Sequence, residues 1–316
     1  SEECENCIAE IRDLFLRIKY RLHRILRNLS NEHKLGIELT FNNKELLDSM
    51  IEFLEPIIKK MKLKPKFSIS CNTFDYVFEK KFLRFEILKN AEIIEEQYGY
   101  KTMLLMQIAD NFINFTRLKS FIGRLHMWNK KYRGLRDLQN LIVLEYLKLD
   151  IKIPGMNAFE SFFADLLLPN SLKGIDFNFS QCICSTTELT PKQINTFKSN
   201  LLFFKALRTL KLIISSDEDV QPIMSEIALS IIEKAPDLET FEYGFKDRLP
   251  SKKPLDLRNF LQVVFSKAPN IKDLTLQTGN SFFQQLSTEL IVQNLNLEHL
   301  KLRFQFQTAD FKNLKK

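Results

Sequence analysis

The chain has 316 residues, of which 45% are hydrophobic and 27% are charged, and it contains 8 glycines and 10 prolines. This composition excludes a disordered chain and long flexible linkers, and the length allows a large core in two domains or in one extended repeat array. No window approaches the roughly 18 uninterrupted apolar residues of a membrane-spanning helix. The five cysteines are unevenly spaced, which argues against a disulfide framework. We therefore expect an intracellular protein of a reducing compartment, with the cytoplasm or cytoskeleton favoured.

The net charge of +7 belongs to the N-terminal half of the chain. Residues 1–136 contain 25 Lys and Arg against 18 Asp and Glu, whereas residues 137–316 contain 21 of each. An excess of positive charge favours contact with acidic proteins or nucleic acids. The first half is therefore the place where the sequence directs a search for a partner.

Residues 4–29 are predicted to form one amphipathic helix. Its apolar residues follow one another at steps of four and three, the spacing of one helix side. They are Cys4, Ile8, Ile11, Phe15, Ile18, Leu22, Ile25 and Leu29. Basic residues occupy the other sides, among them Arg17, Arg21 and Arg24. We expect residues 1–32 to cap the next unit of the fold or to dock on a partner, and a coiled coil is an alternative.

Residues 33–137 alternate between predicted strands and helices without a clean repeat. Alternating apolar and polar residues predict strands at 35–41 and 66–71 and the start of another at 118–122. Apolar residues at helical spacing predict helices at 44–60, 74–97 and 101–115. We interpret the region as degenerate repeats, or as a capping subdomain that continues the same sheet.

From residue 138 to residue 306 one short pattern recurs. Two apolar residues stand three apart, and a third follows two positions later. The six copies are Leu144-Leu147-Leu149, Leu172-Ile175-Phe177, Leu207-Leu210-Leu212, Leu238-Phe241-Tyr243, Ile271-Leu274-Leu276 and Leu297-Leu300-Leu302. Their starts are 28, 35, 31, 33 and 26 residues apart. Residues 307–316 are predicted to form a C-terminal tail.

An apolar helix is expected after each of the first five copies. These helices are predicted at 158–168, 191–205, 220–234, 255–267 and 281–293. Two of them close with the same Lys-Ala-Pro phrase, at 234–236 and 267–269, where the proline stops the helix before the next strand. Because a whole turn recurs as well as the leucine spacing, the sequence predicts a repeat architecture.

A strand-and-helix unit of this length with a Leu-x-x-Leu-x-Leu pattern resembles the leucine-rich repeat family, in its longer, ribonuclease-inhibitor-like variety. The resemblance covers residues 138–306 well and residues 30–130 poorly. It implies an α/β solenoid with a concave parallel sheet and convex helices, here preceded by an N-terminal helical cap. The chain departs from the family three positions after the last apolar residue, where Asn or Cys is usual. That position holds Lys152, Ser180, Ser215, Lys246, Gly279 and Gln305.

The resemblance also implies that the residues between the second and third apolar positions are lateral neighbours on the concave face. They are Lys148, Asp176, Lys211, Glu242, Thr275 and Lys301. The first four alternate in sign, so neighbouring pairs worth about 0.2–1 kcal/mol each are expected. This pattern predicts a self-neutralised face rather than a phosphate-binding one.

The sequence contains no recognised motif for catalysis or cofactor binding. It lacks the glycine-rich loops that hold nucleotide phosphates. Its four histidines are scattered and none neighbours a Ser or Cys in a nucleophile motif. The close thiol pairs, Cys4 with Cys7 and Cys182 with Cys184, lie in different predicted elements and have no histidine nearby, so a zinc site is not expected. We predict no catalytic residue, no cofactor and no metal.

One basic run invites a ligand. Residues 124–136 hold the only tryptophan, a tyrosine and five basic residues, namely Arg124, Trp128, Lys130, Lys131, Tyr132, Arg133 and Arg136. Basic residues between aromatic ones suit an acidic protein surface or RNA. The alternative is a solvated turn with the tryptophan in the core. We predict that this run binds a partner, together with Arg17, Arg21 and Arg24.

These features predict a non-catalytic scaffold or adaptor that binds protein partners as a component of a larger assembly. Two alternatives remain open. One is a substrate-recognition subunit of a ubiquitin ligase, although the predicted helix at 4–29 lacks the Leu-Pro opening that such a subunit would carry. The other is RNA binding through the basic N-terminal half.

Overall fold

The computed structural model describes Arg17, Arg21 and residues 36–41, 66–71, 92–96, 115–126, 134–153, 162–182, 191–216, 221–245, 257–278 and 296–304. Within them, ten strands form one sheet whose order follows the sequence. Every neighbouring pair is parallel. The strands are β1 (Gly36–Phe41), β2 (Lys66–Cys71), β3 (Ile93–Glu96), β4 (Ser120–His126), β5 (Tyr146–Ile153), β6 (Gly174–Cys182), β7 (Thr209–Ser216), β8 (Thr240–Phe245), β9 (Asp273–Thr278) and β10 (His299–Phe304). The predicted α/β fold with a parallel sheet is confirmed.

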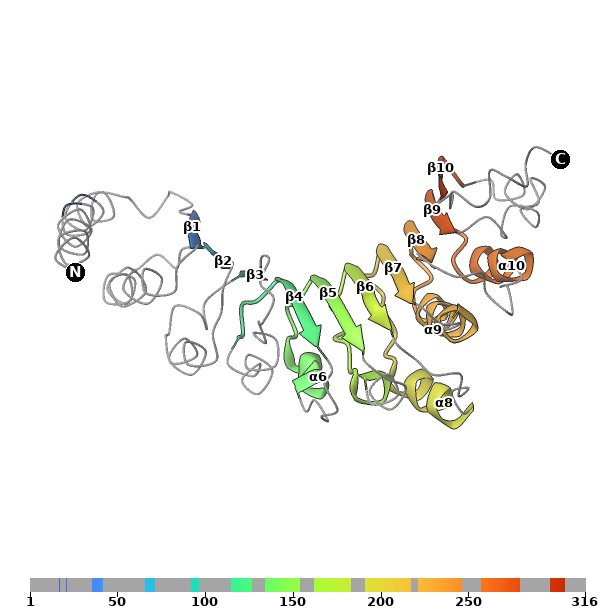
Figure 1. The fold of residues 1–316 in the computed structure, drawn as a ribbon, viewed down its shortest axis with the longest axis horizontal. Helices are drawn as coiled ribbons and strands as arrows, with labels where there is room; N and C mark the ends of the chain where they lie inside the picture. Colours follow the sequence, from blue (N-terminus) through green and yellow to red (C-terminus); the bar gives the residue numbers. More distant parts are fainter. Residues whose placement is uncertain are drawn as a thin grey trace, which may run out of the picture.

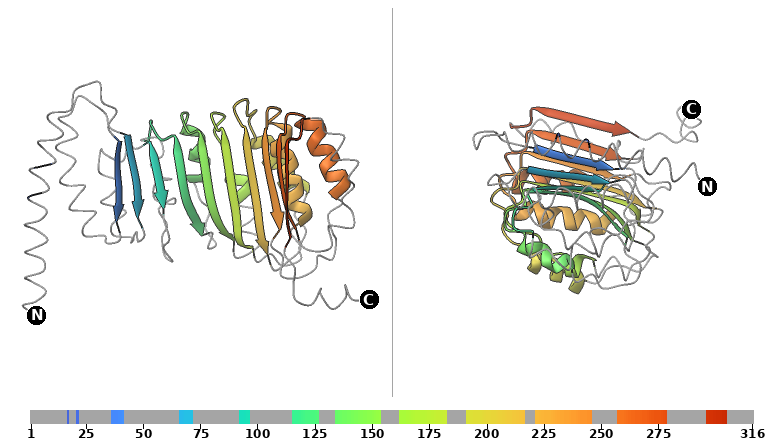
Figure 2. Two further views of the ribbon diagram at one scale, coloured as in Figure 1. Left: turned by 90° about the horizontal axis from the view of Figure 1, so that it is seen from above. Right: turned by 90° about the vertical axis from the view of Figure 1, so that its left-hand side faces the viewer.

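The described helices lie on one side of this sheet, and the strands follow one another along an arc (Figures 1 and 2). Parallel strands need a crossover connection, and these helices form part of the crossovers. They are α6 (Gly134–Asp137), the 3-10 helix η2 (Leu138–Asn140), α8 (Pro191–Asn200), α9 (Gln221–Glu233) and α10 (Leu257–Lys267). Residues 162–165 are also helical. No described helix covers the other side of the sheet, which we call the open face.

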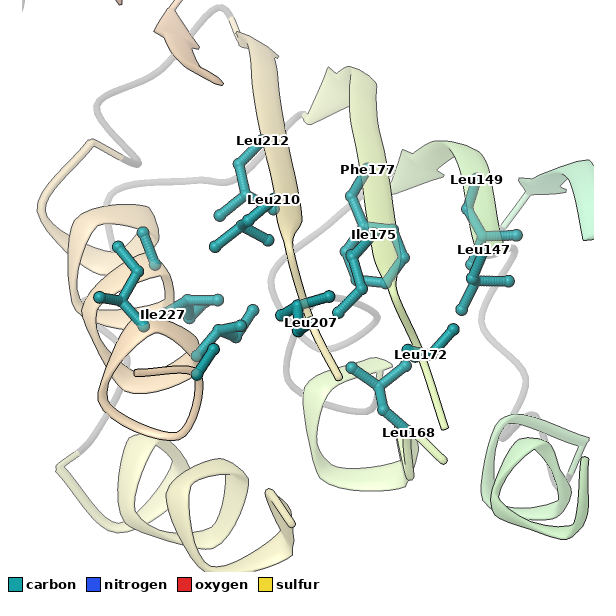
Figure 3. Packing of buried hydrophobic residues seen from close by; sticks show 14 of the residues in the cluster. Leu147, Leu149, Leu168, Leu172, Ile175, Phe177, Leu207, Leu210, Leu212 and Ile227 are labelled. Atoms are coloured by element: carbon teal, nitrogen blue, oxygen red, sulfur yellow. The ribbon is translucent and has the colours of Figure 1, made fainter. Parts of the chain in front are cut away.

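The register of the strands aligns the apolar triplets into one core. Leu147 pairs with Ile175, and Ile175 with Leu210, and the same row continues through Phe241 and Leu274. Each of these five side chains is at most 1% exposed. Because side chains alternate between the two faces of a strand, this row and the next one both point towards the helices. Figure 3 shows the members of both rows from β5, β6 and β7 packed between the strands and the helix layer.

A repeated backbone contact fixes where each strand starts. The Lys173 carbonyl accepts the N–H groups of both Arg208 and Thr209, at 2.9 and 3.0 Å. The same double contact recurs from Glu92 to Lys272. The unequal distances between repeats are therefore absorbed by the loops and helices and not by the sheet. We call the residues at this position the edge column: Glu92, Lys119, Glu145, Lys173, Arg208, Glu239, Lys272 and Glu298.

Most predicted elements that fall on described residues are confirmed. The strands predicted at 35–41 and 66–71 match β1 and β2, and the helices predicted at 220–234 and 255–267 match α9 and α10 within two residues. The helix predicted at 191–205 ends earlier, because α8 stops at Asn200. Past that point the Phe204 N–H donates to the Lys234 carbonyl at 2.8 Å, a contact outside any helix.

The helix predicted at 74–97 is wrong at its C-terminal end. Residues 93–96 form β3, which pairs with both β2 and β4. Ile94 is buried in the same row as Phe121. A run of four residues is too short for its period to distinguish strand from helix, so only the pairing with neighbouring strands decides its structure.

Several predictions fall outside the described residues. They concern the helices at 44–60 and 281–293, the tail at 307–316, and nearly all of the helices at 4–29 and 101–115. In the helix predicted at 4–29, only Arg17 and Arg21 are described, and both are helical and exposed. In the described part of the chain, no helix is long and apolar enough to span a membrane.

Candidate functional site

The open face carries the alternating charges that the sequence predicts as lateral neighbours. The register aligns them across β5–β8 in the order Lys148, Asp176, Lys211 and Glu242. The Lys148 Nζ lies 3.7 Å from Asp176 Oδ2, and the Lys211 Nζ lies 3.4 Å from Glu242 Oε2. The expected neutralisation between neighbours is therefore confirmed for these two pairs. We call the four residues, with Thr275 and Lys301 beyond them, the central row.

Asp176 stands in the middle of the described sheet and is the buried member of this row. Only 8% of its side chain is exposed. Burial raises the pKa of its carboxyl group above the ordinary value, and this effect outweighs the lowering by Lys211 and Lys148. Its Oδ1 has no hydrogen-bond partner among the described residues. A buried carboxylate with one free oxygen destabilises a fold, so this position resembles a functional site more than a structural one.

An aromatic ring lies next to this carboxylate. Tyr146 opens β5 and is the register partner of Gly174 in β6. Burial, and then the negative charge of Asp176, raise the pKa of the Tyr146 hydroxyl. A Cβ atom on Gly174 would lie 2.6 Å from the Tyr146 ring, so the glycine allows the ring to lie against the neighbouring strand.

Further polar contacts flank the central row. The Asn178 Nδ2 donates to Asp150 Oδ1 at 3.3 Å. The Arg303 Nη1 of β10 donates to Glu242 Oε1 at 2.9 Å, across the intervening strand β9. Glu242 therefore contacts two cations, whereas Asp176 has Lys148 as its nearest one. Glu242 thus belongs to a cluster of three charges with Lys211 and Arg303, whereas Lys148 and Asp176 form a separate pair.

The structure separates the two described ends of the basic run that was predicted to bind a partner. Arg124 lies in β4 on the open face, with its Nε 3.7 Å from Asp150 Oδ2. Arg136 lies in α6 on the helix side (Figure 1), where its Nε donates to Asp165 Oδ1 at 2.8 Å. Both arginines thus have an acidic partner within the fold. The other predicted residues, Trp128, Lys130, Lys131, Tyr132, Arg133 and Arg24, lie outside the described residues.

The edge column is a charged feature that sequence reasoning missed. Its members carry ion pairs between neighbouring repeats, such as Lys119 with Glu92 at 3.3 Å and Lys173 with Glu145 at 3.1 Å. Arg208 and Lys272 both contact Glu239, at 3.5 and 3.8 Å. The signal was present, since the position after the first apolar residue of the triplet is charged in all six copies. Except at the buried Glu92, these pairs are exposed, and exposed pairs are worth about 0–1 kcal/mol each, which suits alignment of repeats better than ligand binding.

The described histidine and cysteine residues lie apart from one another in the fold. Within these ranges, no group of three or more His, Cys, Asp and Glu side chains could hold a metal ion. His299 contacts Asp273, with 3.0 Å between Nδ1 and Oδ1, at the exposed end of the sheet. Cys182 ends β6, while Cys4, Cys7 and Cys184 lie outside the described residues. The arrangement that remains is an extended polar surface on a rigid sheet.

A comparison of the chain with protein-family models finds no match, and a comparison with curated proteins finds no significant one.

Proposed function

We propose that this chain is a non-catalytic protein-interaction scaffold of the leucine-rich repeat kind. In this proposal the sheet is the concave side of a solenoid, and the open face receives a protein partner within a larger assembly. The supporting observation is that the two sides of the strands carry different kinds of residue. One side supplies a continuous apolar core, and the other displays a row of polar and charged groups that the register aligns across the strands.

The finer architecture belongs to the same proposal. The recurring triplet, the sequential strand order and the helices on one side all suit a solenoid. The exposed helical positions Arg17 and Arg21 suit an N-terminal cap that continues as a docking helix. Such an array needs terminal units with a polar outer side, and a basic helix supplies one.

The proposal is tested by recovering partners with the full chain as bait, before and after blocking one face. Thr275 in β9 is half-buried on the open face, and Gln262 in α10 is exposed on the helix side. Thr275→Trp adds a large uncharged side chain to the first surface, and Gln262→Trp adds the same side chain to the second. We expect a protein partner at fixed stoichiometry, resistant to nuclease, with the unmodified chain and with Gln262→Trp, but not with Thr275→Trp.

The same recovery experiment separates the alternatives. Cullin-ligase adaptor subunits among the recovered proteins would favour a substrate-recognition subunit of a ubiquitin ligase. Recovery that nuclease abolishes would favour RNA binding. A partner that Gln262→Trp removes and Thr275→Trp retains would place the docking surface on the helix side and contradict the proposal. Circular dichroism of both variants checks that the fold is intact.

A further inference from the structure

In the ion pairs of the central row, the cation and the acid lie in different layers, because the cation is more exposed to solvent. The Lys148 side chain is 47% exposed and its partner Asp176 only 8%, and the Lys211 side chain is 33% exposed and its partner Glu242 only 15%. Arg303, the second cation on Glu242, is 43% exposed. In each of these pairs the acid lies near the sheet and the cation lies towards solvent.

The cause is the length of the side chains. An aspartate on a strand keeps its carboxylate close to the backbone, whereas a lysine carries its ammonium group to the end of a four-carbon stem. On the helix side the arrangement varies. The acid is at least as exposed as the lysine where Lys198 pairs with Glu226 and Lys267 with Glu233, whereas Asp165 is buried beneath Arg136. On the open face, Arg124 and Asp150 are about equally exposed, so the exposed cations above buried acids lie on β5–β8, with Arg303 of β10.

A partner that approaches the open face therefore meets cations that still have unused N–H donors. An ammonium group has three N–H donors and a guanidinium has five. The ammonium groups of Lys148 and Lys211 each contact one carboxylate that lies nearer the sheet, so further donors are left for a partner. An approaching carboxylate can accept these hydrogen bonds without displacing the buried acid.

We infer that the open face between β5 and β8 binds an acidic segment of a partner protein, through Lys148 and Lys211. The inference rests on the proposed function and names the chemistry of the partner. A nucleic acid fits less well, because its affinity comes from neutralising many phosphates at once. Between β3 and β10 the described open face has six cations and five acids, a balance of +1. These residues are Arg124, Lys148, Lys152, Lys211, Lys301 and Arg303, and Glu95, Asp150, Asp176, Glu242 and Asp273.

The experiment titrates the full chain into a fluorescently labelled glutamate 15-mer and follows fluorescence anisotropy at low and high salt. We expect binding that salt weakens and that the double variant Lys148→Gln/Lys211→Gln weakens by about fivefold or more, as expected for two lost charge pairs. The matched control is Lys198→Gln/Lys267→Gln, which removes the same charge from lysines of similar exposure on α8 and α10. This control should bind like the unmodified chain. Circular dichroism and thermal unfolding establish that both double variants are folded.

Three outcomes would overturn the inference. The first is equal weakening by both double variants, which would mean that only net charge matters. The second is unchanged binding when Lys148 and Lys211 are neutralised. The third is tighter binding of a labelled 15-nucleotide uridine oligomer, lost in the same variant, which would make this a nucleic-acid surface. If Thr275→Trp still removes a protein partner while Lys148→Gln/Lys211→Gln retains it, the acidic partner is excluded and the scaffold function stands.

Discussion

Asp176 is the most deeply buried charged residue of the central row, and its burial affects the stability of the fold. Burial raises the pKa of its carboxyl group in the folded protein above the ordinary value of 3.8. The folded state therefore binds the proton more tightly than the unfolded chain does, and stability is lost as the pH rises through the folded-state pKa. At neutral pH the ionised carboxylate lowers the free energy of unfolding.

Replacing Asp176 by asparagine tests this effect of burial on the free energy of unfolding. Asp176→Asn should be more stable than the unmodified chain at pH 7, and the difference should shrink as the pH falls towards 3.8. Urea unfolding over a series of pH values measures it. A less stable Asp176→Asn at pH 7 would mean that attraction to Lys148 and Lys211 outweighs burial.

Arg136 and Asp165 form a contact in which only the acid is buried. Arg136→Ala leaves that carboxylate without its partner in a poorly hydrated position, so we expect a loss of about 1–3 kcal/mol in the free energy of unfolding. Denaturant titration measures this change, and Lys205→Ala, at an exposed position before β7, serves as the control with an expected change within about 0.5 kcal/mol. Similar effects of the two substitutions would contradict the role given to Arg136.

Gly174 is the residue whose missing side chain accommodates Tyr146. A Cβ atom would lie 2.6 and 2.9 Å from two ring carbons, so Gly174→Ala must displace the ring and should cost about 1–2 kcal/mol. Adding Tyr146→Ala to the same chain should restore part of the loss, because the clash is then gone. A double-mutant cycle by denaturant unfolding tests this coupling, and strictly additive effects would refute it.

The strands owe their stability to rows of apolar residues, and the position in the row decides how much each contributes. Leu210 in β7 is fully buried, whereas Leu300 holds the same position in the last strand and is 39% exposed. We expect Leu210→Ala to cost about 2–5 kcal/mol and Leu300→Ala clearly less. Thermal and chemical unfolding of the two variants compare them directly. Equal costs would mean that Leu300 is as well packed as Leu210 and would contradict the dependence on position in the row.

Strand positions were predictable because the triplet encodes both the strand and its buried face. The short strand β3 was not, since its two isoleucines and two glutamates satisfy either period over four residues. The end of α8 was not, because Phe204 leaves the helix for a contact with the next repeat. Such long-range backbone contacts leave no local trace in the sequence.

The open face could be predicted only in part. The alternation of Lys148, Asp176, Lys211 and Glu242 was visible, and so was their lateral pairing. Their layering was not, because it depends on how deeply each side chain lies once its neighbours are in place. The basic run at 124–136 was predicted as one site, but its described ends, Arg124 and Arg136, lie on different sides of the sheet.

At the scale of the whole molecule, ten strands form one sheet, and the proposed docking function uses one side of it. The edge column keeps the strands in register, and the triplets supply a core that continues from one repeat to the next. A rigid array of this kind presents a wide surface without conformational cost, which suits a fixed component of an assembly.

The most direct test places a photo-crosslinking residue, p-benzoylphenylalanine, on each side of the sheet in the full chain. Thr209 in β7 is half-buried on the open face, and Gln262 in α10 is exposed on the helix side. Irradiation in cells should attach one protein partner in high yield at position 209 and little at position 262. Efficient crosslinking at position 262 with none at position 209 would contradict the account.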